Sequence, residues 1–173
     1  MTDQHGPDDY PAGTDDDEPS GLPGARHLML TAPAAELGFA DVPEGTPWGI
    51  AIDIGFDEES AATIVSLLDG TTSLYTTTGG GIVGGGEHDD VAEASRELVA
   101  AAAAHAGDVE LRVDTDLPGE GNVTFWLRMG DDRYARTVSE AELTSGESPL
   151  SALYATVHAV ITQLRLLDDA RGE

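Results

Sequence analysis

The order of the apolar patterns restricts the fold of this chain more than any other feature of its sequence. Three strand-like runs are followed by a helical stretch, and the same order then recurs. The first run alternates apolar and polar residues, and the second is rich in β-branched residues. A period of two is typical of a strand with one buried face, and spacings of three and four residues are typical of an amphipathic helix. We therefore predict an α+β fold, in which two β-β-β-α units form one mainly antiparallel sheet with the helices packed on one face.

The two units form a pseudo-repeat over residues 46–107 and 108–168. The predicted strands cover residues 50–56, 62–68, 71–77, 109–113, 123–129 and 133–138, and the predicted helices cover residues 88–106 and 149–164. Asp69-Gly70, between the second and third runs, is a strong hairpin signal. Ser148 is a suitable N-cap for the second helix. Few residues match between the units, so the pseudo-repeat depends on the shared order of the elements.

The chain is strongly acidic. Its 173 residues include 33 Asp and Glu against 8 basic residues, all of them arginine, and the net charge is −25. Affinity for nucleic acid comes largely from basic side chains that neutralise phosphates, so no nucleic-acid partner is expected. Anionic lipid headgroups are repelled in the same way, and no run is apolar enough to span a bilayer, so no membrane partner is expected either. The charge instead favours a basic protein partner.

Residues 1–45 contain few large apolar side chains, and these cannot offset the entropy that ordering would cost. We predict an acidic, largely disordered leader here, in which residues 28–38 form a short docked helix or an arm. A single α+β domain follows at residues 46–173. The first residues carry no cationic and apolar signal segment, so a cytoplasmic location is expected. The absence of cysteine excludes disulfides, thiolate zinc sites and a cysteine nucleophile.

A glycine-rich loop lies between the third predicted strand and the first predicted helix. Gly79, Gly81 and Gly84 match the G-x-G-x-x-G spacing of a dinucleotide-binding loop. The acidic stretch 87–90 follows directly and would repel a pyrophosphate, so no cofactor is expected. Together with Gly86, these glycines are more typical of a flexible connector with positive φ angles, or of a mobile flap that closes over a partner.

No cluster of residues indicates catalysis or metal binding. His88, Asp89 and Asp90 are consecutive on a predicted helix and point in different directions, and acidic residues in a first turn are the ordinary response to the helix dipole. The Ser and His residues form no known nucleophile motif. We predict that the chain is not an enzyme. A small-ligand or catalytic site at the loop Gly79–Asp90 stays open as an alternative.

The sheet face opposite the helices is the most informative surface of the predicted fold. Alternation places Trp126, Arg128, Arg133 and Arg112 on this face, so that three of the eight arginines and one of the two tryptophans come together. Trp and Arg are enriched in interface hot spots, and an uncovered face that carries them would bind a protein partner or a second copy of the chain. Alternatively, these are scattered surface arginines paired with nearby aspartates.

Two resemblances bear on the fold. The stretch D-G-T-x-S-x-Y at Asp69–Tyr75, followed by G-G-G-x-x-G-G-G-E-H at Gly79–His88, resembles an uncharacterised family of proteins of high-GC Gram-positive bacteria, which implies no function. The order of elements resembles the type III secretion chaperone-like fold and, next, the roadblock/profilin-like fold. The chaperone-like resemblance implies a small acidic homodimer without enzymatic activity.

Three hypotheses follow for the function. The first is a non-catalytic, dimeric protein-interaction domain of chaperone-like or adaptor type, which binds through Arg112, Trp126, Arg128 and Arg133. The second is an acidic, immunity-type inhibitor of a basic protein. The third is a small-ligand or catalytic domain that uses the Gly79–Asp90 loop, and it requires a pocket beside that loop.

Overall fold

The computed structural model describes residues 22–172. Its helices are α1 (Leu22–Thr31), α2 (Asp89–Ala103), α3 (Glu140–Ser145) and α4 (Ser151–Gly172), with 3-10 turns η1 (Ala34–Leu37), η2 (Gly85–Glu87) and η3 (Ala106–Asp108). Its strands are β1 (Gly49–Gly55), β2 (Ala61–Leu67), β3 (Thr72–Thr76), β4 (Gly81–Ile82), β5 (Glu110–Leu111), β6 (Asn122–Met129) and β7 (Asp132–Ser139). The predicted disordered leader covers residues 1–45, and its part at residues 1–21 lies outside the described residues.

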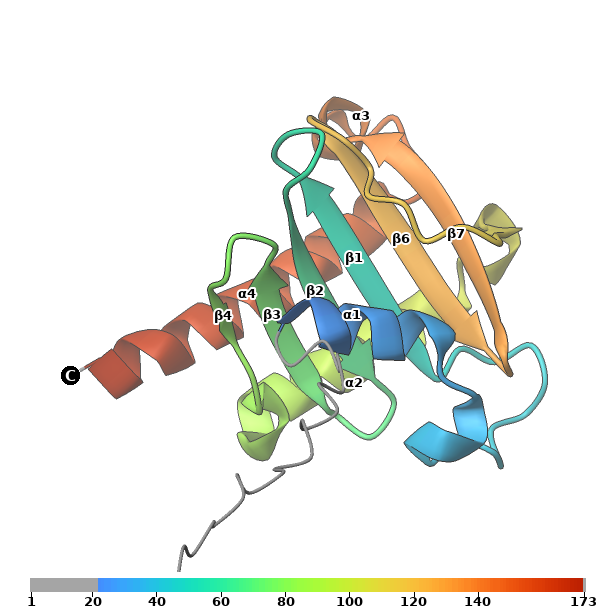
Figure 1. The fold of residues 1–173 in the computed structure, drawn as a ribbon, viewed down its shortest axis with the longest axis horizontal. Helices are drawn as coiled ribbons and strands as arrows, with labels where there is room; N and C mark the ends of the chain where they lie inside the picture. Colours follow the sequence, from blue (N-terminus) through green and yellow to red (C-terminus); the bar gives the residue numbers. More distant parts are fainter. Residues whose placement is uncertain (1–21, 173) are drawn as a thin grey trace, which may run out of the picture.

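The seven strands form one antiparallel sheet in the order β4-β3-β2-β1-β6-β7-β5, which confirms the α+β fold (Figure 1). β1 and β6 pair at the centre and join the two halves. The halves differ at their outer strands, because β5 pairs with β7 and not with β6, and β4 has no counterpart in the second half. β5 ends at Leu111. Beyond it, the carbonyl oxygens of Val113 and Asp114 accept hydrogen bonds from the Arg133 side chain and not from a neighbouring strand.

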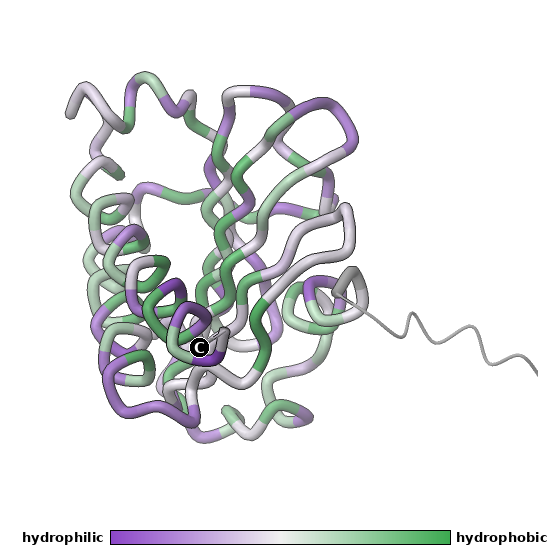
Figure 2. The backbone as a smooth tube through the Cα atoms, turned by 90° about the vertical axis from the view of Figure 1, so that its left-hand side faces the viewer, coloured by the Kyte–Doolittle hydropathy of each residue, from purple (hydrophilic) through white to green (hydrophobic). Residues whose placement is uncertain are grey.

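Helices α2 and α4 cover the inner face of the sheet, which is the face that carries Ile52 and Phe125 (Figure 2). Leu98 of α2 and Leu164 of α4 are fully buried against it. The inward residues of β1 and β6 are the apolar members of their alternating runs, so burial of this face provides most of the hydrophobic stabilisation. Packing of the two long helices on one face agrees with the prediction.

Helix α1 covers the outer face, which is the face that carries Asp53 and Trp126 (Figure 1). Met29 and Leu30 of α1 pack there, and both are buried. The prediction allowed a short docked helix or arm at residues 28–38, and the structure has α1 and η1 in this part of the chain. The expectation that the outer face is uncovered is therefore wrong at its centre.

A buried carboxylate joins α1 to the sheet. Asp53 of β1 is completely buried and pairs with Arg26 of α1 at 2.6 Å. The Trp126 indole N–H donates to the same carboxylate at 2.8 Å, and the Thr63 hydroxyl donates to it at 2.6 Å. Burial of a charge is costly unless the charge is paired and hydrogen-bonded, and here both conditions are met. This network determines where α1 lies on the sheet.

A buried arginine holds the other end of α1. The Arg128 guanidinium is fully buried and donates hydrogen bonds to the carbonyl oxygens of Met29 and Ala32. These carbonyls belong to the carboxyl-terminal end of α1, where the helix dipole favours a positive charge. The same guanidinium lies over the ring of Trp48, 4.7 Å from its centroid. Arg128 therefore acts as the C-terminal cap of α1.

Candidate functional site: a cleft between α4 and the sheet

A cleft of about 490 Å³ opens between α4 and the inner face of the sheet, beside the turn that joins β3 to β4. The cleft combines an apolar floor with converging polar groups, which is the usual composition of a binding site. Its lining residues are Ile54, Phe56, Ala62, Ile64, Leu74, Thr76, Gly80, Gly81, Glu140, Tyr154, His158, Ile161 and Arg165.

The floor of the cleft is formed by inward residues near the ends of β1, β2 and β3. Register places Ile54 opposite Ala62, and Ala62 opposite Thr76. The small side chain of Ala62 in the middle of this row leaves space that a larger residue would fill. α2 contributes no lining residue, whereas α4 contributes four and α3 contributes its first residue, Glu140.

Helix α4 forms the opposite wall through one of its faces. Tyr154, His158, Ile161 and Arg165 follow each other at intervals of four, three and four residues, so their side chains share that face. Tyr154 and Ile161 are buried, whereas His158 and Arg165 are exposed at the opening of the cleft. The wall is therefore apolar inside and polar at its margin.

A hydrogen-bonded group closes one end of the cleft. The Tyr154 hydroxyl donates to Oε1 of Glu140 at 2.8 Å, and the His158 ring packs edge-on against the Tyr154 ring with centroids 4.6 Å apart. Burial raises the pKa of Tyr154 above its ordinary value, and the neighbouring Glu140 raises this pKa further. Tyr154 is therefore a neutral hydrogen-bond donor at neutral pH and positions Glu140.

An acidic turn follows the exposed ring of Phe56, which lines the cleft and is 53% accessible. The next three residues, Asp57, Glu58 and Glu59, are all acidic and exposed. The hydroxyl of Ser60 and the backbone amide of Glu59 donate to the Asp57 carboxylate and lower its pKa. Asp57 therefore keeps its negative charge to a lower pH than an ordinary aspartate does.

Several polar groups of the cleft are already hydrogen-bonded within the chain. Thr76 carries the aliphatic hydroxyl group of the cleft. This hydroxyl makes hydrogen bonds within the β3–β4 turn, including one that it accepts from the amide of Gly80 at 3.2 Å. Among residues 22–172, no group of three His, Asp or Glu side chains is placed to hold a metal ion. An apolar group of a ligand could enter the cleft, while Glu140 and the exposed margin contact polar groups beside it.

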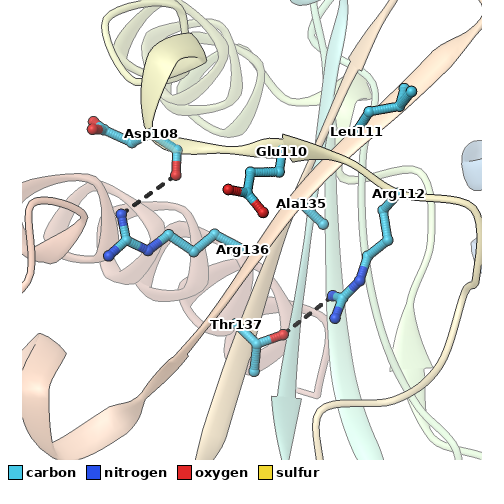
Figure 3. Close-up of a pocket in the computed structure, with 7 residues that line it drawn as sticks. All are labelled: Asp108, Glu110, Leu111, Arg112, Ala135, Arg136 and Thr137. Atoms are coloured by element: carbon cyan, nitrogen blue, oxygen red, sulfur yellow. Dashed lines mark hydrogen bonds between the residues drawn. The ribbon is translucent and has the colours of Figure 1, made fainter.

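A second cavity, of about 540 Å³, lies at the β5–β7 edge (Figure 3). Arg136 donates to the carbonyl oxygen of Asp108 at 3.5 Å, and Arg112 donates to the Thr137 hydroxyl at 3.2 Å. Glu110 projects between these two arginines. The lining is mainly polar and lacks an apolar floor, so this cavity is the weaker candidate.

The four residues predicted to bind a partner do lie together on the outer face, but their contacts are within the chain. Trp126 and Arg128 are fully buried beneath α1. Arg112 lies over the Trp126 ring at 5.4 Å and pairs with Asp114 at 3.5 Å. Arg133 donates to the carbonyl oxygen of Leu30 in α1 at 3.2 Å. This cluster therefore fastens α1 and the 113–118 segment to the sheet.

The glycine-rich loop is packed against the sheet and does not form one tight turn between a strand and a helix, because β4 and η2 separate its glycines. Gly79 and Gly84 have φ angles of 105° and 75°, which non-glycine residues rarely adopt. At Gly81 and Gly86, a Cβ atom would lie 2.9 Å from the Cα atoms of Tyr75 and Thr71, respectively. The φ angles and the close packing therefore require glycine at these four positions.

Replacing Gly86 with alanine is expected to lower the free energy of unfolding by about 1–3 kcal/mol, the usual cost of forcing extra atoms into a packed site. The new methyl group would overlap the carbonyl oxygen of Gly70. Gly107→Ala is the matched control, since a Cβ atom there meets nothing within 4 Å. Urea titration followed by circular dichroism measures both. Equal stability of the two variants would contradict the close packing of this loop.

The sequence pattern did not predict this cleft. His158 and Arg165 lie on α4, and the depression beside them forms only where α4, the start of α3 and three strand ends meet. The recurrence of polar residues at 158 and 165 on an otherwise apolar face was the only available signal.

No helix within residues 22–172 is long and apolar enough to cross a membrane. No protein family, curated protein or solved structure was found that matches this chain.

Proposed function

We propose that this chain is a non-catalytic protein-interaction domain, and that the α4 cleft takes an apolar side chain from a basic segment of a partner protein. The observation that carries the proposal is the cleft itself, which has an apolar floor and is open to solvent next to an exposed aromatic ring. Exposed apolar surface with a polar margin is typical of interaction sites. This site lies on the inner face of the sheet, whereas the sequence pattern predicts an interaction site on the outer face.

The charge of the chain supports a basic partner. The net charge is −25, and the turn Asp57–Glu59 adds three carboxylates directly after Phe56. Such a field accelerates the approach of a positive segment and repels a negative one. An acidic inhibitor of a basic protein is compatible with the same field, but it needs no cleft, and the cleft therefore favours the interaction domain.

The test is calorimetric titration with the peptide acetyl-Arg-Thr-Val-Thr-Leu-Thr-Arg-amide. Replacing its valine and leucine with serine is expected to weaken binding at least about tenfold, since burial of one aliphatic side chain contributes about 1.5–3 kcal/mol. Replacing both arginines with glutamate is expected to abolish binding at low salt. Raising the salt concentration is expected to lower the affinity for the original peptide. Equal affinity of the serine and original peptides would show that the proposal is wrong.

Two protein variants locate the site. Ala62→Phe would fill the middle of the floor and is expected to lower the affinity for the original peptide at least about tenfold. Ala103→Phe, on the exposed surface of α2, is the matched control and should bind normally. Thermal unfolding must show both variants folded. If the folded Ala62→Phe variant keeps full affinity, the peptide does not bind in the cleft.

A further inference from the structure

The sheet ends at the two-residue edge strand β4, which carries no charged side chain and no proline. From Gly70 to Gly86 the chain contains no acidic or basic residue, and β4 lies in this neutral stretch. Edge strands of natural proteins are commonly protected by charged side chains or proline, which prevent another strand from pairing with them. The glycines and Val83 beside β4 provide neither kind of protection.

The backbone groups of this edge face outward at two residues. The amide of Thr76 donates to the carbonyl oxygen of Gly80 at 2.8 Å, and Leu74 lies opposite Ile82. Antiparallel strands alternate between residues that bond to the neighbour and residues that face away from it. The N–H and C=O groups of Gly81 and Val83 therefore point away from β3, toward the open edge.

Helix α4 extends beyond this edge. In Figure 1 it crosses behind the sheet, and its last turns continue past β4 toward the carboxyl terminus. Leu166 in these turns is 58% exposed. A strand added next to β4 would lie against this part of α4, so one of its faces would be covered as the inner face of the sheet is covered elsewhere. The helix thus extends over the position of one more strand.

The open edge adjoins the cleft. Gly80 and Gly81 belong to the β3–β4 turn and to β4, and both line the cleft together with Ile161 and Arg165 of α4. A segment that paired with β4 would direct every second side chain toward α4, and one of these side chains would enter the cleft. Acidic residues lie after the edge at Glu87, Asp89 and Asp90. The edge is therefore neutral and adjoins negative charge.

We propose that an extended segment of the partner protein adds to the sheet as an eighth strand, paired with the outward groups of Gly81 and Val83. Its neutral centre presents alternate apolar side chains to α4 and the cleft, and its basic ends meet the acidic residues around the edge. Strand addition supplies affinity through main-chain hydrogen bonds and specificity through alternate side chains. This inference rests on the proposed function, because it assumes that the cleft binds a basic segment.

The experiment uses two N-methylated isomers of the peptide acetyl-Arg-Thr-Val-Thr-Leu-Thr-Arg-amide. One carries methyl groups on the amides of valine and leucine, and the other carries them on the amides of the second and third threonines. Successive amides of a strand point to opposite sides, so only one isomer blocks the bonds to β4. We expect one isomer to bind at least about tenfold more weakly than the other, which corresponds to the loss of two ordinary hydrogen bonds.

The protein side is tested with Val83→Pro, which removes an outward N–H group, and with Val83→Ala as the matched control that keeps it. Val83→Pro is expected to lower the affinity for the unmethylated peptide at least about tenfold, and Val83→Ala is expected to lower it less than about threefold. In the parent protein, hydrogen exchange at Gly81 and Val83 should slow when the peptide binds. This measurement keeps the inference testable if the proline variant fails to fold.

Three results would overturn the inference. Equal binding of the two isomers, together with loss of binding in Ala62→Phe, would leave the cleft as the site but exclude strand addition. Absence of binding by the unmethylated peptide would remove the proposed function and this inference together. Concentration-dependent dimerisation that Val83→Pro abolishes would show that the edge is occupied by a second copy of the chain.

Discussion

The Asp53→Ala variant is expected to lose about 3–5 kcal/mol of unfolding free energy, the usual cost of leaving the partner of a buried ion pair uncompensated. The substitution removes the acceptor of Arg26, Thr63 and Trp126 together. Arg26 is only 15% exposed, so water can solvate the orphaned guanidinium only partly. Urea unfolding followed by circular dichroism measures the loss, with an unchanged slope as the sign that the unfolded state is unaffected.

The matched control for Asp53→Ala is Asp114→Ala. Asp114 pairs with Arg112 at 3.5 Å and is 50% exposed, so its removal should cost less than about 1 kcal/mol. Asp53→Asn separates charge from shape, because the amide keeps an oxygen that can accept from Trp126 or Thr63, but it loses the attraction for Arg26. We expect the free energy of unfolding of Asp53→Asn to lie between those of the parent protein and Asp53→Ala. A cost at Asp53 as small as that at Asp114 would refute the central role of this carboxylate.

The second large effect is expected at Arg128. Arg128→Met keeps most of the side-chain volume but leaves the carbonyl oxygens of Met29, Ala32, Asp131 and Asp132 without this donor. We expect a loss of about 3–5 kcal/mol, because several buried backbone acceptors lose a charged partner at once. Equilibrium unfolding in urea measures the total, and hydrogen exchange resolves where it occurs.

Hydrogen exchange distinguishes a cap from a general core residue. If Arg128 holds the end of α1, amides of α1 should exchange faster in Arg128→Met by a larger factor than amides of β1. Arg171→Met, on the exposed last turn of α4, is the matched control and should change neither stability nor the exchange of α1. A uniform acceleration across the sheet would contradict the specific role in docking α1.

These two expectations change how binding variants should be designed. The alternating pattern predicts Trp126 and Arg128 as partner-binding residues, but both are completely buried. Loss of partner binding in variants of these residues would reflect unfolding or release of α1. Exposed positions such as Phe56 and Val83 change the proposed binding surface without opening the core.

The strands and their two faces were predictable from the sequence because side-chain alternation is a local property. Period two assigned Phe125 to the inner face and Trp126 to the outer face, and both assignments hold. The hairpin at Asp69-Gly70 and the two long helices were recognised for the same reason, since their signals lie within a few neighbouring residues. Short elements such as β4 and α3 were missed because they contain too few residues for a period.

What covers each face was decided by the tertiary structure. Arg128 and Met29 are 99 positions apart in the chain, and no local pattern relates them. Alternation gives the side on which a residue projects, but burial depends on which distant segment packs there, and α1 begins with a Pro23-Gly24 pair that weakens its helical signal. The cleft has the same origin, because it lies where α4 and three strand ends meet. The sequence therefore determined the sheet and the sidedness of its residues, whereas long-range packing buried the expected interface and opened the cleft on the opposite face.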